Sequence, residues 1–457
     1  MIWSESTARA RVGRLRIVMA AAAAVALASA AALTAAPAEA AGSSTQLEVS
    51  RGVTIPAFYN PPAALPARNG ALIRSEPLEL GAGLTLPAVG TLPGTATRVM
   101  YSTTDSNGVR AAATGAYLEP AAPWRGVGAR PLVVLAPGTM GQGDQCAPSL
   151  ALQHPIIFNG QTVSVGYEDI AAYRLLAEGV AVMVTDYLGF GTTDRVHTYV
   201  NRVDEGHAVL DAARAALQVP GASVTRSSRV GLYGYSQGGG ATAAAAELRD
   251  SYAPDVNLVG SYVGAPPADL AAVAAGIDGS ALAGALGWTL NSLLQSYPSL
   301  APIVAAHVND AGRAALADLA TACIGDGLAG YAFQKSSGWT NDGETLMQIA
   351  AKEPAIQRAL AAQKLGTLVP SGPVRVATGV ADDIVPHAQA RQLAVDWCRR
   401  GGDVSYVPIP VPNLGDGLLT NHISPLLADQ GTAIAWLTQR VDGITAGSNC
   451  ATLSVLP

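Results

Sequence analysis

A serine with small neighbours is the first residue of this chain whose setting suggests chemistry. Ser236 lies in the segment Gly234-Tyr235-Ser236-Gln237-Gly238, a G-x-S-x-G motif that follows a short apolar run and precedes an alanine-rich stretch. Small residues beside a serine let the chain turn sharply from a strand into a helix and expose Oγ above a sheet. The alternative is a glycine-rich turn with an incidental serine, since the chain contains 49 glycines. The strand before the motif and the helix after it favour a nucleophile.

A serine hydroxyl is a weak nucleophile, so a base and an orienting carboxylate are required as well. After a strand-turn-helix serine they follow in the order acid, then histidine. Asp382 and Asp383 come directly after the apolar run 374–378 and precede Pro386. We assign Asp382 as the orienting acid because it begins the turn. Asp383 is the alternative, and we expect its side chain to point into solvent or to cap the next helix.

Three histidines follow Ser236 in the chain, and His422 is the best candidate for the base. It lies in the segment 417–425, which we interpret as a loop between the last strand and the last helix. His307 falls in a helical stretch, and His387 is too close to Asp382 in sequence to approach the serine easily. The alternative for His422 is a surface histidine. The three histidines before Ser236 are expected to be structural or exposed: His154, His197 and His207.

An ester or amide carbonyl under attack also needs two backbone N–H donors for its developing negative charge. The residue after the nucleophile supplies one donor, which here is Gln237. The second donor is expected after an early strand, and the run 132–136 ends in the turn Pro137-Gly138-Thr139-Met140-Gly141. Thr139 or Met140 is therefore the candidate, with an ordinary strand-end turn as the alternative.

Apolar runs of strand length alternate with helix-like stretches along the chain. The predicted strands span residues 132–136, 180–185, 230–233, 258–263, 374–378 and 404–409. The predicted helices span residues 170–178, 205–217, 241–250, 388–399 and 424–439. This alternation predicts an α/β fold with a mostly parallel sheet covered by helices on both faces.

One long stretch interrupts this alternation. Residues 266–370 are rich in Ala and Leu and contain no good strand, which predicts a helical cap inserted between two strands. Residues 41–265 and 371–457 would form the two parts of the body. Within the first part, residues 41–125 read as turn-rich with a few extended pieces.

The first forty residues are typical of an export signal. Four arginines precede the uncharged run 17–36, and Ala38 and Ala40 supply small residues at the two positions that a signal peptidase reads. The alternative is a permanent membrane anchor. Cleavage is favoured by the weakly hydrophobic alanines and by the small residues at the end. The chain is therefore predicted to be secreted.

Four cysteines in an exported chain predict two disulfide bonds. They are Cys146, Cys323, Cys398 and Cys450, and they allow three connectivities. A zinc site is disfavoured because no two of these cysteines are close in sequence and the six histidines are scattered. The net charge of −6 disfavours nucleic-acid binding, which needs a basic face.

Taken together, the serine turn, Asp382 with its neighbours to Pro386, the Asn421-His422 pair, the segment 146–149 and the long helical insert resemble the secretory lipase family of α/β-hydrolases. The similarity covers most of residues 55–455. It implies Ser236 as nucleophile, Asp382 as acid and His422 as base, under an inserted cap. It also implies bonds from Cys146 to Cys323 and from Cys398 to Cys450. One departure is the turn 137–139, where a fungal member carries acidic side chains.

We therefore expect a secreted serine lipase or esterase that hydrolyses carboxylic esters, acylglycerols by resemblance, through an acyl-enzyme. Within the same chemistry, a short-chain carboxylesterase or a polyester hydrolase is the alternative. A serine peptidase and a non-catalytic binding protein are alternatives of a different class. No metal or organic cofactor is required. Expected partners are the ester substrate and a transient lipid interface, with no nucleic acid and no obligate protein partner.

Overall fold

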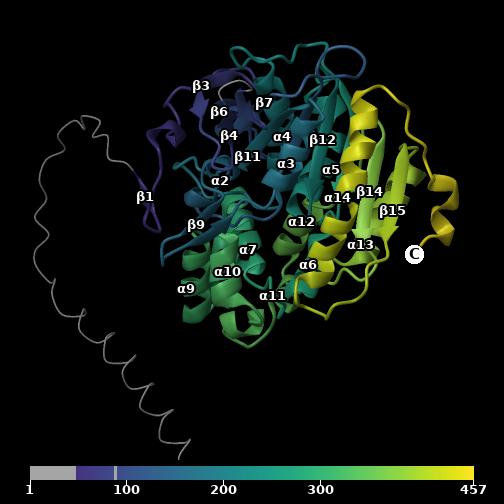
Figure 1. The fold of residues 1–457 in the computed structure, drawn as a ribbon. Coiled ribbons are helices and arrows are strands. Elements are labelled where there is room, and N and C mark those ends of the chain that lie inside the picture. The colour runs from purple at the N-terminus through teal and green to yellow at the C-terminus, as the bar shows by residue number, and fades with distance from the viewer. Residues whose placement is uncertain (1–47, 87–89) are drawn as a thin grey trace, which may run out of the picture. The chain divides into compact units, whose positions relative to one another are not determined.

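The computed structural model describes residues 48–86 and 90–457. The predicted export signal, residues 1–40, lies outside the described residues. Within the part that is described, no helix is both long enough and apolar enough to cross a bilayer. Most of this part is arranged around one large sheet, which positions the candidate site (Figure 1).

The main sheet of the described residues has nine strands in the order β15-β14-β13-β12-β8-β11-β7-β6-β3. The strands from β15 to β11 are parallel, and β7, β6 and β3 continue the sheet as antiparallel neighbours. The predicted α/β fold with a mostly parallel sheet is confirmed. The parallel strands are β8 (Leu132–Ala136), β11 (Ala181–Leu188), β12 (Val230–Tyr235), β13 (Leu258–Gly264), β14 (Val374–Gly379) and β15 (Val404–Ile409).

Helices cover both faces of the sheet, which explains why its central strands are apolar throughout. All five residues of β8 are buried. Leu132 and Val134 pack on the side of helices α4 and α5, and Val133 and Leu135 pack on the side of α3 and α14. The body helices are α2 (Pro148–Gln153), α3 (Asp169–Ala177), α4 (Arg202–Ala216), α5 (Gln237–Tyr252), α13 (His387–Arg399) and α14 (Thr420–Val441).

The region 41–125, predicted to be turn-rich, contains three strands of the main sheet among its described residues. They are β3 (Leu72–Leu78), β6 (Gly94–Thr104) and β7 (Arg110–Pro120), and β6 pairs with β7 over eleven residues. The prediction was wrong here because β7 is rich in alanine, a weak strand former, and is buried on both faces, so it shows no alternation of apolar and polar residues. Among the described residues, three two-stranded sheets lie outside the main sheet: β1 (Val49–Ser50) with β2 (Val53–Thr54), β4 (Leu84–Leu86) with β5 (Gly90–Leu92), and β9 (Ile156–Phe158) with β10 (Val163–Val165).

The chain between β13 and β14 is helical and contributes no strand to the main sheet in the described structure. These helices gather at one end of the sheet (Figure 1). They form an apolar cluster around Trp288 that also includes Tyr199 and Ile384 from outside this segment. The indole N–H of Trp288 donates to the carbonyl of Leu319 at 3.0 Å. The helices are α6 (Leu270–Ile277), α7 (Ala285–Ser296), α8 (Ala301–His307), α9 (Asp310–Leu319), α10 (Ile324–Tyr331), α11 (Leu346–Ala350) and α12 (Pro354–Ala362).

Two disulfide bonds tie distant parts of the chain together. Cys146 is bonded to Cys323, and Cys398 is bonded to Cys450, which are the pairings that the resemblance implies. The first bond joins the segment after β8 to the start of α10. Backbone hydrogen bonds reinforce the same junction, from Gln142 to the Ala322 carbonyl at 2.9 Å and from Ile324 to the Met140 carbonyl at 2.8 Å. The turn after β8 and the helical segment therefore meet at a fixed junction.

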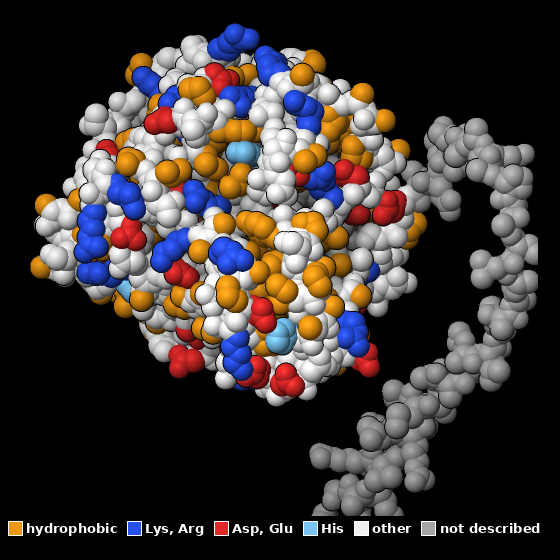
Figure 2. All heavy atoms as spheres, turned by 180° about the vertical axis from the view of Figure 1, so that it is seen from behind, with side chains coloured by type: hydrophobic (Ala, Val, Ile, Leu, Met, Phe, Trp, Pro, Cys, Tyr) orange, Lys and Arg blue, Asp and Glu red, His pale blue; other side chains and the backbone are white. Residues whose placement is uncertain are grey.

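The surface carries charges of both signs. Figure 2 shows basic and acidic side chains interspersed with apolar ones on the face turned away from the viewer in Figure 1. Apolar side chains are also exposed near α10, including Phe158 on β9 and Val165 on β10.

Candidate active site

Ser236 occupies a strained turn between β12 and α5. Its backbone φ of +58° and ψ of −123° lie in a region that residues other than glycine rarely adopt. The glycines of the motif make this turn possible, because a Cβ at Gly234 would lie 2.1 Å from the Gly238 carbonyl oxygen and one at Gly238 would lie 2.0 Å from the Ala136 carbonyl oxygen. The tight packing leaves the Ser236 side chain above the carboxyl end of the central strands. Ser236 is partly exposed, whereas its neighbours on both sides are buried.

Asp382 and His422 form a buried pair beside this turn. His422 Nδ1 lies 2.7 Å from Asp382 Oδ2, and both side chains are almost completely inaccessible to solvent. The other carboxylate oxygen of Asp382 accepts from the backbone N–H groups of Ile384 and Val385, at 3.2 and 3.0 Å. These donors fix the carboxylate in the loop after β14, so it holds the imidazole in one orientation.

His422 lies in the first turn of α14, although the sequence predicted a loop there and a helix beginning at residue 424. Pro425 lies inside this helix, although a proline is tolerated best in the first turn. The structure continues α14 through Pro425, against Gly379 at the end of β14. A Cβ on Gly379 would lie 2.4 Å from Cγ of Pro425, so this approach depends on the missing side chain.

Asp383 is half-buried, and the expectation that it points into solvent was wrong. Its Oδ2 accepts a hydrogen bond from the backbone N–H of Gly417. The loop before α14 folds over the loop after β14, which the sequence pattern did not reveal. Asp383 therefore holds the loop that leads to His422, and Asp382 contacts the imidazole itself.

Ser236 and His422 line one pocket, which we call the His422 pocket. It has a cavity volume of about 290 Å³ and a mainly apolar wall that includes Leu282, Leu328 and Leu426. His422 Nε2 is buried and has no hydrogen-bond partner among the described residues. No hydrogen bond to Ser236 Oγ is formed in the part of the chain described. In structures without substrate, such contacts are often long and tighten only when substrate binds.

Of the two candidates for the second oxyanion donor, Thr139 lines the His422 pocket and Met140 does not. Met140 is buried in the body core. The turn is held in place by Glu168, whose Oε1 accepts from the Gly138 N–H at 2.9 Å, and by the Tyr167 hydroxyl, which donates to the Thr139 carbonyl at 3.1 Å. Burial raises the pKa of Glu168 to about 7. Gln237, the other candidate donor, begins α5, where backbone N–H groups have no partner within the helix.

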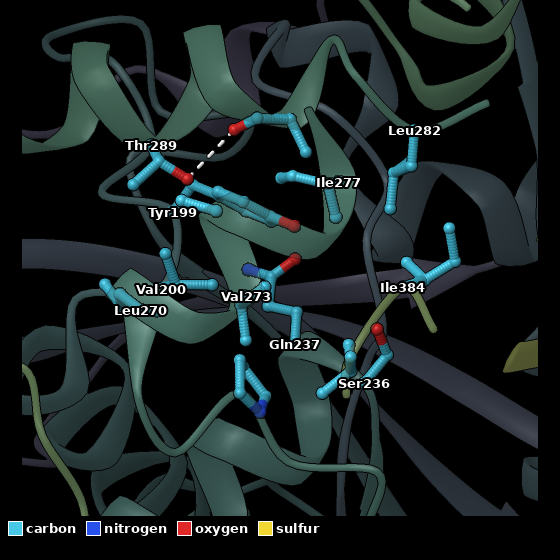
Figure 3. A pocket seen from close by; sticks show the side chains of 14 residues that line it. Tyr199, Val200, Ser236, Gln237, Leu270, Val273, Ile277, Leu282, Thr289 and Ile384 are labelled. Atoms are coloured by element: carbon cyan, nitrogen blue, oxygen red, sulfur yellow. Dashed lines mark hydrogen bonds between the residues drawn. The ribbon is translucent and has the colours of Figure 1, made fainter. Parts of the chain in front are cut away.

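Ser236 also lines a second pocket, which we call the Gln237 pocket (Figure 3). The helical segment contributes most of its apolar wall, including Leu270, Val273 and Ile277. Its cavity volume is about 30 Å³, so it is far narrower than the His422 pocket. Tyr199 lies at its wall, with its hydroxyl 2.8 Å from Thr139 Oγ1.

Behind this pocket lies a buried polar cluster that the sequence did not reveal. Gln237 Nε2 lies 2.8 Å from His197 Nε2 and 2.8 Å from Glu205 Oε1. His197 Nδ1 lies 2.9 Å from the Leu188 carbonyl oxygen. Burial lowers the pKa of His197 to about 4 and raises the pKa of Glu205 to about 8. The one available signal was Glu205 on the otherwise apolar face of α4, and it does not indicate a partner.

The remaining histidines after Ser236 lie away from the serine. His307 ends α8 and contacts Glu353 at 3.1 Å. His387 begins α13, with Nδ1 3.1 Å from the Gly379 carbonyl oxygen and Nε2 3.0 Å from the Tyr406 hydroxyl. In the described structure, no group of three His, Cys, Asp or Glu side chains is placed to hold a metal ion.

Known proteins resemble this chain over most of its length. A family model described as secretory lipase matches residues 152–449. The "Probable inactive lipase MT1628" of Mycobacterium tuberculosis is 31% identical over 391 residues, which cover 84% of this chain and 82% of that protein. The "Secreted triacylglycerol lipase LIP2" of Malassezia globosa is 27% identical over 311 residues, covering 67% of this chain and 65% of that protein.

Solved structures share the fold at low sequence identity. The closed state of Candida antarctica lipase A superposes with a TM-score of 0.74 and 22% identity, covering 87% of this chain and 88% of that one. The rice cell wall degrading esterase LipA from Xanthomonas oryzae superposes with a TM-score of 0.65 and 20% identity, covering 82% of this chain and 98% of that one. With the family model and the sequence relatives, these likenesses show that the chain belongs to the secretory lipase family and has the α/β-hydrolase fold.

Proposed function

We propose that this chain hydrolyses carboxylic esters with Ser236 as nucleophile, His422 as general base and Asp382 as the acid that orients the imidazole. One observation supports the assignment most directly. The His422–Asp382 pair is buried and hydrogen-bonded, and it leaves Nε2 without a described partner in the pocket that Ser236 lines. A histidine held in this way accepts a proton at Nε2 and is stabilised as an imidazolium by the carboxylate.

The proposed reaction has two stages. Ser236 Oγ attacks the ester carbonyl carbon while His422 Nε2 takes the hydroxyl proton, and the carbonyl electron pair moves onto oxygen. The tetrahedral intermediate collapses, the ester C–O bond breaks, and the alcohol leaves with the proton from His422. Water then attacks the acyl-enzyme in the same way, giving the carboxylic acid and restoring the Ser236 hydroxyl.

The developing oxyanion is assigned to two backbone N–H groups. Gln237 supplies one from the start of α5, where the helix dipole also favours negative charge. Thr139 supplies the other in our proposal, because it lines the His422 pocket and Met140 does not. The contacts from Glu168 and Tyr167 to this turn support it as a rigid donor.

The organisation of the chain follows the same proposal. Residues 1–40 are an export signal, so the secreted chain begins at Ala41. Residues 266–370 form a cap over Ser236, and residues 41–265 and 371–457 form the body. The apolar wall that α6 contributes to the Gln237 pocket supports a cap role. Mass spectrometry of the chain exported by a suitable host would identify the new N-terminus.

The proposed substrates are acylglycerols or related lipid esters. The mainly apolar walls of the two pockets suit acyl chains, and several relatives are named as secreted triacylglycerol lipases. The narrowness of the Gln237 pocket favours a second candidate, a carboxylesterase or polyester hydrolase acting on short acyl groups. The two candidates differ in the acyl-chain length that gives the highest kcat/KM.

The test is hydrolysis of p-nitrophenyl esters, from acetate to palmitate, by the secreted chain. Ser236→Ala should lower kcat by about three orders of magnitude or more while leaving the circular dichroism spectrum unchanged. Ser251→Ala, an exposed serine at the far end of α5, is the matched control and should retain activity.

A preference for long chains would support the lipase, and a preference for acetate or butyrate would support the short-chain candidate. Equal hydrolysis by wild type and Ser236→Ala would overturn the nucleophile assignment. Absence of turnover on every ester would instead group this chain with its relative that is named an inactive lipase.

A further inference from the structure

The carboxamide of Gln237 can adopt only one orientation, and its neighbours decide which. The Leu188 carbonyl can only accept, so the hydrogen on the ring of neutral His197 must lie on Nδ1. His197 Nε2 is then an acceptor, and the Gln237 atom 2.8 Å away must be the NH₂ nitrogen. Glu205 Oε1 accepts the second hydrogen of the same nitrogen, and it also accepts from the Val200 N–H at 2.8 Å. A flipped amide would place its oxygen against the lone pair of His197 Nε2.

The carbonyl oxygen of Gln237 is consequently left on the side of the pocket. Gln237 is 1% exposed, and its Oε1 has no hydrogen-bond partner among the described residues. Its side chain lies among the residues that line the pocket, between Tyr199 and Val273 in the view of Figure 3. A buried carbonyl without a donor is unfavourable, so a ligand that donates to it gains a corresponding advantage.

The chemistry at Ser236 determines which part of an ester reaches this oxygen. His422 must return its proton to the leaving alcohol, so the alcohol departs on the side of the His422 pocket. The acyl group then extends into the second pocket that Ser236 lines, the Gln237 pocket. Apart from Gln237, the polar groups among its wall residues are the hydroxyls of Ser236, Tyr199 and Thr289. Thr289 donates to the Ala285 carbonyl at 2.9 Å, and Tyr199 is engaged with Thr139.

We propose that the Gln237 pocket selects short acyl groups that carry a hydroxyl, and that this hydroxyl donates a hydrogen bond to Gln237 Oε1. The inference rests on the proposed ester hydrolysis and specifies its substrate class as hydroxyacyl esters. The cavity volume of about 30 Å³ is enough for roughly one or two water-sized groups, which limits the acyl chain. The apolar walls of α6 accommodate the methylene groups, and the single acceptor recognises the donor.

Comparing each hydroxy ester with the corresponding methoxy ester shows whether the pocket recognises a hydrogen-bond donor or only a polar oxygen, because a methoxy group cannot donate. The probes are methyl hydroxyacetate and methyl 3-hydroxybutanoate, each beside its methoxy counterpart and the unsubstituted methyl ester, with acid release followed by titration at constant pH. For the hydroxyl position that gives the higher kcat/KM, wild type should hydrolyse the hydroxy ester with a kcat/KM about five- to tenfold higher than that of the methoxy ester. This is the gain expected for one neutral hydrogen bond. Equal values in wild type would overturn the proposal and indicate that a water molecule satisfies the oxygen.

Two variants separate recognition from folding. Gln237→Met keeps the length of the side chain without an acceptor, so the ratio of hydroxy to methoxy kcat/KM should fall to about one, whatever happens to the absolute rate. Leu270→Ala enlarges the same pocket without touching the acceptor, and its ratio should stay above one. An unchanged ratio in Gln237→Met would overturn the proposal. Ester hydrolysis that survives in Ser236→Ala would instead overturn the proposed function, so the two failures are distinguishable.

Discussion

Two buried histidines lie near the Ser236 turn, one lining a pocket with Ser236 and one against the Gln237 side chain, and they differ in whether Nε2 has a partner. His422 is hydrogen-bonded through Nδ1 to Asp382, and its Nε2 has no described partner. His197 is hydrogen-bonded through Nδ1 to a main-chain carbonyl, and its Nε2 is occupied by Gln237. Both are close to carboxylates, so residue type and neighbourhood do not distinguish them. The nitrogen that is left free determines which histidine can accept a proton from Ser236.

The carboxylates near these two histidines, Asp382 and Glu205, differ in whether they contact the imidazole directly. Asp382 contacts its imidazole directly and receives two backbone N–H bonds. Glu205 contacts Gln237, which lies between it and His197. The desolvation that raises the pKa of Glu205 to about 8 leaves it largely protonated at neutral pH, so it cannot stabilise an imidazolium as Asp382 can. The His422 side is arranged for proton transfer, and the His197 side for fixing an amide.

Among these replacements, that of Asp382 should have the largest effect, a loss of kcat. Asp382→Asn keeps the shape but favours the wrong imidazole tautomer, and we expect kcat to fall by about four orders of magnitude. The measurement is ester hydrolysis at saturating substrate. Asp383→Asn is the matched control, because Asp383 contacts the loop rather than the imidazole, and its kcat should change less than about tenfold. Comparable losses in both variants would contradict the assignment of Asp382.

Glu205 should act on stability rather than on turnover, through its raised pKa. The folded protein keeps the carboxyl protonated up to about pH 8, whereas the unfolded chain releases the proton near pH 4.5. This group therefore favours folding most below pH 4.5, and its contribution is lost as the pH rises to 8. Glu205→Gln should make the decline of unfolding free energy with pH less steep, by at most about 1.4 kcal/mol per pH unit. Urea unfolding at pH 5, 6, 7 and 8 measures the slope, and a steeper decline in the variant would contradict the raised pKa.

Replacing His197 should have the smallest effect of the three replacements. It should lower stability rather than turnover, whereas replacing His422 should lower turnover. His197→Phe keeps the stacking on Phe190, whose ring centre lies 4.0 Å away, but leaves the Leu188 carbonyl and a Gln237 N–H unpaired. We expect a loss of about 1–3 kcal/mol in unfolding free energy. In His422→Phe the dominant effect should be a loss of kcat of at least about a thousandfold. A similar loss of kcat in His197→Phe would show that the two sides are not distinct.

The sequence predicted the parallel strands well, because they are short apolar runs, several of them β-branched. β8 and β15 span the residues predicted for them, and β13 extends one residue further. The alanine-rich strand β7 lacked that signal. The first turn of α14 was not predicted. A proline inside a helix is unfavourable, and the space for Pro425 depends on Gly379, which is remote in sequence.

The sequence predicted those parts of the candidate site that lie at the ends of strands and follow one another in a fixed order along the chain. The turn at Ser236, the loop at Asp382 and the histidine after the last strand are local patterns. The cluster of His197, Glu205 and Gln237 was not predictable, because its members come from three separate segments and meet only through packing. The cysteine count alone likewise left three connectivities open.

The two disulfide bonds divide the chain into covalent rings with a linear segment between them. Ser236 belongs to the ring closed by Cys146 and Cys323, which are 177 residues apart, and His422 belongs to the ring closed by Cys398 and Cys450. A protease that cuts one peptide bond inside either ring leaves every residue attached to the same molecule. A single cut separates Ser236 from His422 only when it falls between residues 323 and 398, the stretch that also carries Asp382. In a protease-containing medium, resistance of that connecting stretch sets how long the three residues remain parts of one molecule.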